Sequence, residues 1–360
     1  MKKIVIVTPS LGGDISGGGA EKVIINIANF LQDDFKFLII AIKNENKYEQ
    51  DLDKEIKVIK LNKSRAFYSI PAIYNILNKE KPDIIFSTLS HVNFLMGFLR
   101  ILFPNRVKFL ARESIVLSKK NRKYKHKKFM DRLFSKSFSN FDTIICQSKD
   151  MRNDLRQNYR IKSDKLTVIN NPVDVQTIKE KSKTNEKLFD KNVINLLAVG
   201  RLSHQKGYDM MFEIVAKMDK KYKLTVLGEG DHRSFLKELA TKLQIEDKIK
   251  MPGFVQNPYK YMNQADVVVM TSRFEGFPNV LIEANACGTP VVAFECQGGI
   301  REIIKDNVNG FKIKPGDSFS FCSAIEKAFF LKKEKIVEHV DKNFSHHMII
   351  NQYKKIFDEL

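Results

Sequence analysis

An alternation of short apolar strands and helical segments is the feature that most constrains how this chain can fold. Residues 2–8, KKIVIVT, form a continuous β-branched run that is typical of a strand buried on both faces. A glycine-rich loop and a segment with apolar residues at helical spacing, EKVIINIANFL, come next. This order of elements predicts a parallel sheet with right-handed crossovers. Further strand-like runs occupy residues 35–42, 56–61, 83–87, 107–112 and 142–148.

A second series of the same kind begins near residue 193, after a stretch in which the periodicity is lost. Residues 170–192 are polar, contain Pro172 and are typical of a linker. We therefore expect an α/β protein with two Rossmann-like, doubly wound parallel-sheet domains that face each other across a cleft. The second set of strand-like runs is 193–200, 222–228, 248–253, 265–272 and 289–294. The expected boundaries are 1–172 for the N-terminal domain, 173–192 for the linker, 193–345 for the C-terminal domain, and 346–360 for a final helix that packs back on the N-terminal domain.

The chain is strongly basic. It has 61 Lys and Arg against 42 Asp and Glu, a formal net charge of +19, and most of the excess lies between residues 101 and 165. Clustered basic side chains attract phosphate groups, whether these belong to nucleic acid, anionic lipid or a diphosphate-bearing substrate. The charge alone leaves these three kinds of partner open.

The cysteine spacing and the N-terminal segment favour a cytoplasmic protein. The four cysteines stand in no CxxC or zinc-binding spacing, so we expect reduced thiols, and MKKIVIVTPS has too short an apolar run for a secretory signal. Residues 84–103 are long enough to span a bilayer, but they include His91 and Arg100. A charge at the centre of a spanning helix costs about 2.5–3.5 kcal/mol, so we prefer a strand followed by a buried helix.

The loop after the first strand, SLGGDISGGGAEKV, is rich in glycine and leads into a helix. Glycine lets the backbone approach a ligand closely, and a helix start offers unpaired N–H groups to a phosphate. The loop matches neither the Walker pattern nor the dinucleotide-binding pattern. It fits a ligand-binding loop of another kind, with a merely flexible turn as the alternative.

A basic loop follows the first strand of the second series. The segment VGRLSHQKGYDMM places Arg201 and Lys206 between a strand and a helix. A diphosphate at that strand end would satisfy both cations. A solvated basic loop is the alternative interpretation.

Two carboxylates lie in the segment TSRFEGFPNVLIEANACGTPVVAF, residues 271–294. Glu275 lies in a loop after a strand and Glu283 in the next helix, with Gly276 allowing a tight turn and Pro278 at the helix entry. Carboxylates accept hydrogen bonds only, so the pair suits a ligand with several hydroxyl donors, such as a sugar and a ribose. The alternative is one carboxylate that interacts with the helix dipole and one solvated acid.

The segments GGGAEKV, GRLSHQKG and EGFPNVLIEANACGTPVVAF, in this order and spacing, resemble the retaining glycosyltransferases of family 4, which have the GT-B fold. The resemblance extends over essentially the whole chain. It implies a nucleotide-sugar held mainly by the second domain, with the diphosphate on Arg201 and Lys206, the ribose on Glu283 and the transferred sugar on Glu275. The implied chemistry is same-face displacement with retention, in which the departing diphosphate, stabilised by Arg201 and Lys206, helps to deprotonate the acceptor. The further donor-binding residues that it implies are Gly18, Gly19, Gly228, Val255, Gly276, Asn279, Val280 and Leu281.

The chain departs from the family pattern on the acceptor side. Many members carry a histidine after the strand that here reads VKFLAR, where this chain has Arg112, Glu113 and Ser114. We take Arg112, Glu113 and the nearby His91 as acceptor-site candidates, although His91 suits a structural role equally well. Asp51-Leu52-Asp53 has the metal-binding pattern of a different glycosyltransferase fold, but it lies in a charged stretch, so we expect no metal and no cofactor, the nucleotide-sugar being a substrate.

The basic stretch KKNRKYKHKKFMDRLFSKSF, residues 119–138, mixes cationic and aromatic residues. Such a helix suits an anionic membrane surface, with a plain solvated face as the alternative, and nucleic acid is disfavoured because no recognised motif accompanies the stretch.

We expect a cytoplasmic enzyme, peripheral on the inner face of the plasma membrane. It would move a UDP-linked hexose or N-acetylhexosamine to a lipid-linked glycan in the synthesis of bacterial surface polysaccharide, such as capsule or lipopolysaccharide O-antigen, or of a glycoprotein. The alternatives are a transferase with a small soluble acceptor and a non-catalytic binding protein that uses the basic surface.

Overall fold

The structure, a computed structural model, describes residues 1–12, 19–45, 47–120 and 126–360. The chain forms two compact units, each described here by itself. The first unit comprises Met1–Asn171 together with Ile349–Leu360, and the second unit comprises Pro172–Met348.

The first unit is built on a seven-stranded parallel sheet in the order β3-β2-β1-β4-β5-β6-β7. The strand order reverses between β1 and β4, which is the point where ligands bind in sheets of this kind. The strands are β1 (Lys3–Thr8), β2 (Lys36–Ala41), β3 (Lys57–Lys60), β4 (Ile84–Thr88), β5 (Lys108–Glu113), β6 (Thr143–Cys146) and β7 (Leu166–Val168).

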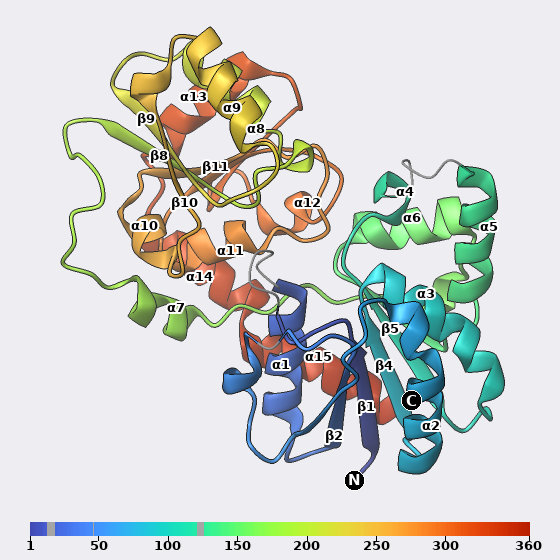
Figure 1. The fold of residues 1–360 in the computed structure, drawn as a ribbon. Helices are drawn as coiled ribbons and strands as arrows, with labels where there is room; N and C mark the ends of the chain where they lie inside the picture. Colours follow the sequence, from blue (N-terminus) through green and yellow to red (C-terminus); the bar gives the residue numbers. More distant parts are fainter. Residues whose placement is uncertain (13–18, 46, 121–125) are drawn as a thin grey trace. The chain divides into compact units, whose positions relative to one another are not determined.

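Helices cover both faces of this sheet, as Figure 1 shows. Successive side chains of a strand point to opposite faces, so Val5 and Val7 join one core cluster and Ile4 and Ile6 the other. The first face carries α2 (Ile70–Glu80), α3 (Ser90–Leu99), α5 (Lys127–Phe138) and α6 (Lys149–Tyr159), with α4 (Leu117–Lys120) beside α6; the second face carries α1 (Gly19–Leu31) and the last helix, α15 (His346–Glu359). Short 3-10 turns are η1 (Glu49–Asp51), η2 (Ala66–Ser69), η3 (Arg100–Leu102) and η5 (Ser163–Lys165).

The second unit repeats the plan with a six-stranded parallel sheet, β10-β9-β8-β11-β12-β13. Its strand order reverses between β8 and β11. The strands are β8 (Ile194–Val199), β9 (Tyr222–Leu227), β10 (Ile249–Gly253), β11 (Val267–Met270), β12 (Val291–Phe294) and β13 (Gly310–Ile313). The helices are α7 (Val175–Ser182), α8 (Tyr208–Ala216), α9 (Arg233–Lys242), α10 (Tyr259–Gln264), α11 (Asn279–Ala286), α12 (Ile300–Ile303), α13 (Ser318–Ala328) and α14 (Lys333–Phe344), with 3-10 turns η6 (His204–Lys206) and η7 (Glu246–Lys248).

The expected α/β class with two parallel sheets is confirmed, and two details differ from the sequence analysis. The strands β7 and β13 were not expected, because runs of three and four residues carry little periodicity. Residues 173–192 are not a structureless linker, since they contain α7. Asp174 accepts a hydrogen bond from the backbone N–H of Thr177 at 2.9 Å and so caps this helix, and Ile178 buries its side chain in the core of the second unit.

The last helix returns to the first unit. Phe357 of α15 lies in edge contact with Phe35 and Phe86, at ring-centroid distances of 5.5 and 5.8 Å. The Nζ of Lys2 donates hydrogen bonds to the backbone oxygens of Phe357 and Asp358, at 3.0 and 2.7 Å. The two ends of the chain therefore complete one core.

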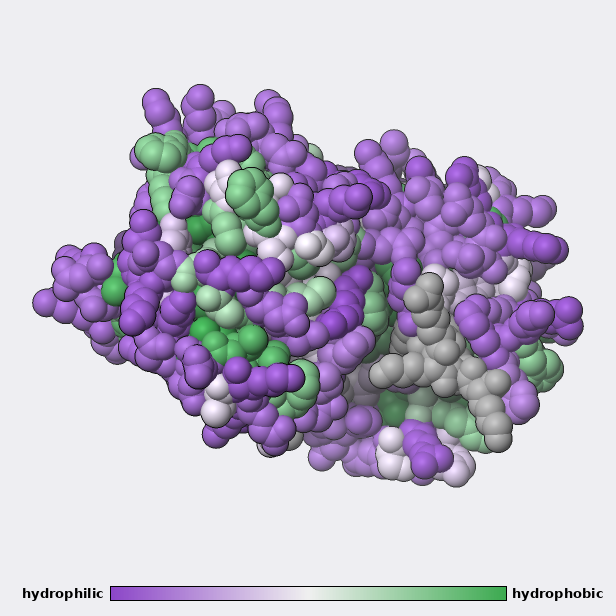
Figure 2. All heavy atoms as spheres, turned by 90° about the horizontal axis from the view of Figure 1, so that it is seen from above, coloured by the Kyte–Doolittle hydropathy of each residue, from purple (hydrophilic) through white to green (hydrophobic). Residues whose placement is uncertain are grey.

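Residues 84–103 form β4, α3 and the 3-10 turn η3. Within the described residues, no helix has the length and the apolar character needed to cross a membrane. On the face drawn in Figure 2, hydrophilic side chains cover most of the surface and hydrophobic ones appear in small groups.

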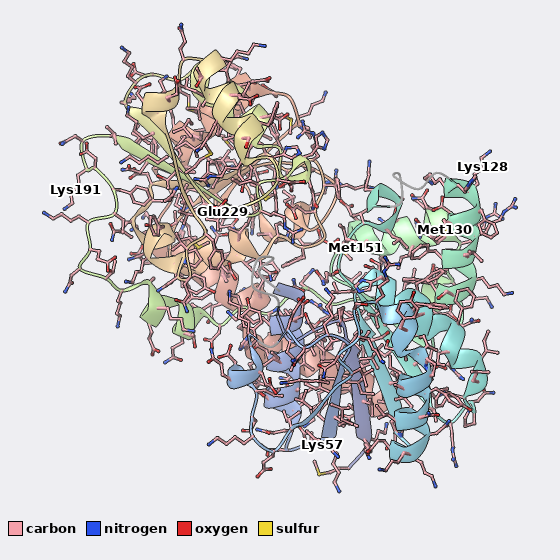
Figure 3. All side chains as sticks on the ribbon, in the orientation of Figure 1. Lys57, Lys128, Met130, Met151, Lys191 and Glu229 are labelled. Carbon is pink, nitrogen blue, oxygen red and sulfur yellow. The ribbon has the colours of Figure 1, made fainter. Side chains whose placement is uncertain are left out.

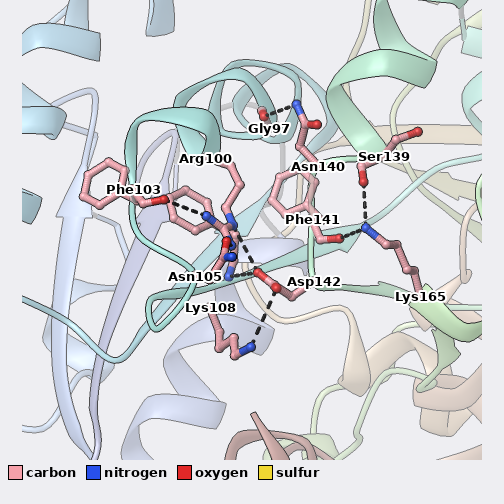
Figure 4. A network of polar contacts seen from close by, with 11 residues as sticks. Gly97, Arg100, Phe103, Asn105, Lys108, Ser139, Asn140, Phe141, Asp142 and Lys165 are labelled. Atoms are coloured by element: carbon pink, nitrogen blue, oxygen red, sulfur yellow. Dashed lines mark hydrogen bonds and ion pairs between the residues drawn. The ribbon is translucent and has the colours of Figure 1, made fainter.

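Asp142 anchors η3 to the sheet of the first unit, as Figure 4 shows. Its Oδ2 accepts hydrogen bonds from the backbone N–H of Phe109 at 2.8 Å and from Nε of Arg100 at 3.2 Å. The Nζ of Lys108 lies 4.0 Å from Oδ1. These contacts fix the amino-terminal ends of β5 and β6, at the sheet edge opposite to the strand carboxyl ends.

Candidate active site

The carboxyl ends of β8 and β11 bring together two of the residues singled out in the sequence. Because these strands are neighbours in the sheet, the loops that follow them emerge side by side. Lys206 ends the turn η6 after β8, and Glu275 lies in the loop after β11. The Nζ of Lys206 lies 2.7 Å from Oε1 of Glu275, and Glu275 is only 6% exposed. From the sequence we expected separate roles for these two residues, and their pairing is a finding of the structure.

The loop after β12 holds the backbone of Glu275 in place. The N–H of Glu275 donates to the backbone oxygen of Gln297 at 2.9 Å, and the N–H of Gly299 donates to Gly276 at 2.8 Å. Gly298 has a φ of +139°, and a Cβ there would lie 2.7 Å from the backbone oxygen of Glu275. The close approach therefore requires glycine at position 298.

A second layer of polar groups lies next to Lys206. The hydroxyl of Tyr208 donates to the backbone oxygen of Gly200 at 3.1 Å. Burial raises the pKa of Tyr208, and the Glu275 carboxylate raises it further, so the phenol stays neutral. A small cavity is lined by Lys206, Tyr208 and Ser272, among others, and the buried Ser272 hydroxyl has no hydrogen-bond partner within the described part of the chain.

The helix α11 begins directly after this loop, at Asn279, with Pro278 before it. Its amino-terminal end carries partial positive charge, which suits a phosphate. Asn279 and Val280 are partly exposed, whereas Leu281 is buried. Glu283 is also partly exposed, and its charge adds to burial in raising the pKa of the Cys287 thiol to about 12. Cys287 is therefore a protonated, inert thiol at neutral pH.

Three more of the residues expected at the donor site lie on loops at the carboxyl ends of the strands of the second sheet. Arg201 is exposed, two residues beyond β8, and Val255 is partly buried, two residues beyond β10. Gly228 donates its N–H to the backbone oxygen of Gly253 at 2.8 Å. A Cβ at Gly228 would lie 2.1 Å from the backbone oxygen of Gly200, so the loops after β8 and β9 pack in direct backbone contact. In the first unit, Gly19 opens α1, and Gly18 lies outside the described residues.

The three acceptor candidates have different environments in the first unit. His91 is exposed in the first turn of α3. Arg112 is fully buried, and its guanidinium donates to the hydroxyl of Tyr353 at 3.1 Å and to Oδ1 of Asn171 at 2.7 Å. Glu113 is also fully buried and accepts hydrogen bonds, including one from the hydroxyl of Ser90 at 2.6 Å. Arg112 and Glu113 thus make buried hydrogen bonds inside the first unit, and their role in binding the acceptor stays a prediction.

Glu21 is a titratable residue that the sequence analysis did not single out. It lies in the first turn of α1. Burial raises its pKa, and the positive charge of Arg112 lowers the pKa in part. Its place directly after the glycine-rich loop was the one signal that could have marked it.

The aspartates of the Asp-x-Asp sequence lie in a turn of the first unit, where Asp53 makes hydrogen bonds within the protein. Asp53 accepts hydrogen bonds from the backbone N–H of Glu55 at 3.0 Å and from Nε2 of Gln32 at 3.2 Å, and Asp51 lies in η1. Across the part of the chain that the structure describes, no group of three or more His, Cys, Asp or Glu residues is arranged to hold a metal ion.

The chain has two doubly wound parallel-sheet units, and in the second unit a Lys–Glu pair and the amino terminus of a helix lie at the carboxyl ends of the strands. This architecture is that of the GT-B class of proteins. Residues 179–347 match the family described as glycosyl transferases group 1, and residues 17–177 match glycosyltransferase family 4. A solved structure of Anabaena Alr3699/HepE in complex with UDP-glucose superposes with a TM-score of 0.84 at 21% identity and covers 100% of both chains, which shows the fold.

Two curated relatives carry the resemblance further. The N-acetylgalactosamine-N,N'-diacetylbacillosaminyl-diphospho-undecaprenol 4-alpha-N-acetylgalactosaminyltransferase of Campylobacter jejuni is 30% identical over 339 residues, which are 91% of this chain and 90% of the relative. The lipopolysaccharide 1,6-galactosyltransferase of Escherichia coli is 30% identical over 154 residues, which are 40% and 43% of the two chains. The chain belongs to glycosyltransferase family 4, and it is therefore a glycosyltransferase enzyme.

Proposed function

We propose that this enzyme is a retaining hexosyltransferase. It moves a hexose or N-acetylhexosamine from a UDP-sugar to a lipid-linked glycan acceptor in the synthesis of bacterial surface polysaccharide, such as lipopolysaccharide or capsule. The observation that carries the proposal is the Lys206–Glu275 pair at the carboxyl ends of β8 and β11, next to the start of α11. The lipid-diphosphate substrate in the name of the C. jejuni relative and the UDP-glucose in the solved neighbour support the acceptor and the donor.

Lys206 has a partner before the donor binds and a second one afterwards. Without donor its ammonium group is neutralised by Glu275 at 2.7 Å. In the donor complex, the three N–H donors of Lys206 serve a phosphate oxygen as well as the carboxylate, and the exposed Arg201 adds a second cation. Glu275 then also accepts from hydroxyl groups of the sugar, and Glu283 accepts from the ribose hydroxyls.

The transfer step exchanges one bond to the anomeric carbon for another on the same face. The bond from this carbon to the phosphate oxygen breaks, and the bond to the acceptor oxygen forms. The acceptor proton passes to an oxygen of the departing diphosphate. Lys206 and Arg201 stabilise the negative charge that develops on the diphosphate, a contribution worth about 3–4 kcal/mol for a well-placed group in enzymes of other classes.

Calorimetric titration with UDP, GDP and ADP tests the donor site. We expect UDP to bind more tightly than the other two, and Glu283→Gln to weaken UDP binding about 10-fold, which corresponds to about 1.4 kcal/mol. Glu238→Gln, in the exposed face of α9, is the matched control and leaves UDP affinity unchanged. Binding of none of the three nucleotides would reject the donor site, and equal UDP affinity in Glu283→Gln would reject the ribose role.

The stereochemistry of the product tests retention. With an α-linked UDP-sugar and a lipid-diphosphate-linked disaccharide as acceptor, we expect an α-linked product in the NMR spectrum. A β-linked product would show inversion and would overturn the proposed same-face step. Transfer to a small soluble sugar with no transfer to the lipid-linked acceptor would reject the acceptor class.

We also propose that α5 contacts the anionic inner face of the plasma membrane. Lys128, Arg132 and Lys136 are exposed and recur every four residues, so they form one stripe, whereas Phe134 and Phe138 face the core. Lys128 points away from the helix in Figure 3. Each basic residue near an anionic bilayer contributes about 1 kcal/mol.

Sedimentation with vesicles tests the membrane contact. We expect the protein to sediment with phosphatidylglycerol vesicles and not with phosphatidylcholine vesicles, and the triple variant Lys128→Glu, Arg132→Glu, Lys136→Glu to stay in the supernatant. The control triple variant Lys237→Glu, Lys242→Glu, Lys335→Glu makes the same charge change at exposed positions of the second unit. If both triple variants sediment like the wild type, α5 is simply a solvated basic face.

A further inference from the structure

A bidentate ion pair joins the loop that carries Glu275 to α8, the helix that follows the loop of Lys206. Arg273 precedes Glu275 by two residues, and Asp209 lies in the first turn of α8. The Nη1 of Arg273 lies 2.9 Å from Oδ1 of Asp209, and Nη2 lies 2.6 Å from Oδ2. Both side chains are 27% exposed, so water competes only partly with the pair. Bidentate geometry fixes the relative orientation of the two side chains as well as their separation.

Further hydrogen bonds connect the loop after β8 to the loop after β11. Nη1 of Arg273 also donates to the backbone oxygen of His204, and the backbone N–H of Arg273 donates to Gln205, both at 2.8 Å. In return, Nε2 of Gln205 donates to the backbone oxygen of Phe274 at 2.9 Å. These bonds flank the Lys206–Glu275 contact on both loops. Arg273 takes part in most of them, so it is the centre of the arrangement.

We propose that Arg273 and Asp209 are positioning residues that keep the loops after β8 and β11 in register while Lys206 takes the donor diphosphate as a second partner beside Glu275. This inference rests on the proposed function, in which Lys206 turns toward the donor diphosphate. At that moment Lys206 shares its N–H donors between the diphosphate and Glu275, so the direct Lys206–Glu275 bond weakens and a further contact must hold Glu275 against the sugar. The Arg273–Asp209 pair contains neither of the donor-binding groups, so it stays closed during the step.

Breaking the Arg273–Asp209 pair should lower the rate of the chemical step more than it lowers the affinity for UDP. The ribose partner, Glu283, lies on α11 beyond Pro278. The diphosphate partners, Arg201 and Lys206, lie on the loop between β8 and α8, and this loop keeps its connections to both elements when the pair is broken. UDP affinity should therefore change little when the pair is broken. The position of Glu275 relative to Lys206 should change, and with it the turnover number.

Hydrolysis of a UDP-sugar and calorimetry with UDP, on the full chain, test the pair. The substrate is whichever of UDP-glucose, UDP-galactose, UDP-N-acetylglucosamine and UDP-N-acetylgalactosamine gives the fastest release of UDP. We expect Asp209→Asn to lower kcat at least about 10-fold, because a displacement of about 1 Å in a catalytic group has effects of up to about 100-fold, while the Kd for UDP stays within about threefold. Arg273→Lys keeps the positive charge but cannot make both parallel hydrogen bonds to Asp209. We therefore expect its kcat to lie between those of the wild type and Asp209→Asn.

A double variant and a control separate positioning from general stability. If the two residues act only through each other, Asp209→Asn combined with Arg273→Gln is no slower than the slower single variant. Asp306→Asn is the matched control: Asp306 pairs with Lys312 at 2.9 Å in the turn before β13, at the opposite edge of the sheet, and its kcat and Kd should equal those of the wild type.

Each other outcome has a distinct meaning. A wild-type kcat in Asp209→Asn would overturn the proposal, as would a parallel loss of UDP binding and thermal stability, which would indicate a contribution to folding only. Failure of the wild type itself to bind UDP would instead reject the proposed function, and the positioning role with it.

Discussion

Gly298 is the residue on which the position of Glu275 depends most directly. A methyl group at this residue would lie 2.7 Å from the backbone oxygen of Glu275 and 3.1 Å from its Cβ. We expect Gly298→Ala to displace the carboxylate and to lower UDP-sugar hydrolysis about 10-fold or more. Gly316→Ala is the control, because Gly316 also has a positive φ, +90°, but within the described residues no atom beyond its two chain neighbours lies within 4 Å of the added methyl group. It should cost about 1–2 kcal/mol of stability without changing kcat, and equal activity in both variants would contradict the prediction.

Glu21 should make the stability of the first unit depend on pH. Because burial raises the pKa of Glu21, the folded state binds its proton more tightly than the unfolded state does. The charged carboxylate therefore opposes folding at neutral pH, and this cost disappears as the pH falls through the folded-state pKa. We expect Glu21→Gln to raise the free energy of unfolding at pH 7.5, and the gain to shrink toward zero at acid pH. The exposed Glu55→Gln is the control in urea titrations, and a gain in Glu21→Gln that grows on acidification would refute the sign.

At the scale of the elements, Asp142 ties η3 to the starts of β5 and β6 (Figure 4). We expect Asp142→Ala to lower the free energy of unfolding by about 2–3 kcal/mol, because it leaves the Phe109 N–H and the Arg100 guanidinium without this charged acceptor. Urea titration measures this change. Asp164→Ala, in the exposed turn before β7, should cost less than about 0.5 kcal/mol. UDP affinity should be the same in both variants, because Asp142 and Asp164 belong to the first unit and the loops that carry Lys206 and Glu275 belong to the second.

The elements themselves were largely predictable, since a buried parallel strand is a local run of apolar residues and a helix start has its own local signals. Prediction failed where the signal was short or mixed. Residues 175–182 form α7 with only a few buried side chains, of which Val175 and Ile178 are the apolar ones, in an otherwise polar stretch. Periodicity is too weak there to distinguish a helix from a linker.

At the scale of the whole molecule, the end of the chain stabilises its beginning. Phe357 is fully buried among residues of the first sheet and α1. We expect Phe357→Ala to lower the free energy of unfolding of the first unit by about 3–5 kcal/mol. Hydrogen exchange of the β1 and β2 amides reports this unit separately. Phe319→Ala, at a residue that is 86% exposed on α13, is the control and should be nearly neutral; unchanged protection of β1 and β2 in Phe357→Ala would contradict the role of α15.

The sequence by itself determined the two parallel sheets, the loops that follow their strands and the kinds of side chain on those loops, because each is a local pattern read within about ten residues. Only the tertiary structure decided which of these side chains meet. Lys206 and Glu275 pair across 69 positions of the chain, Arg273 reaches Asp209 across 64, and Arg112 is buried against Tyr353 across 241. Such contacts depend on strand order and on which loops pack together, and a linear pattern of residues carries neither.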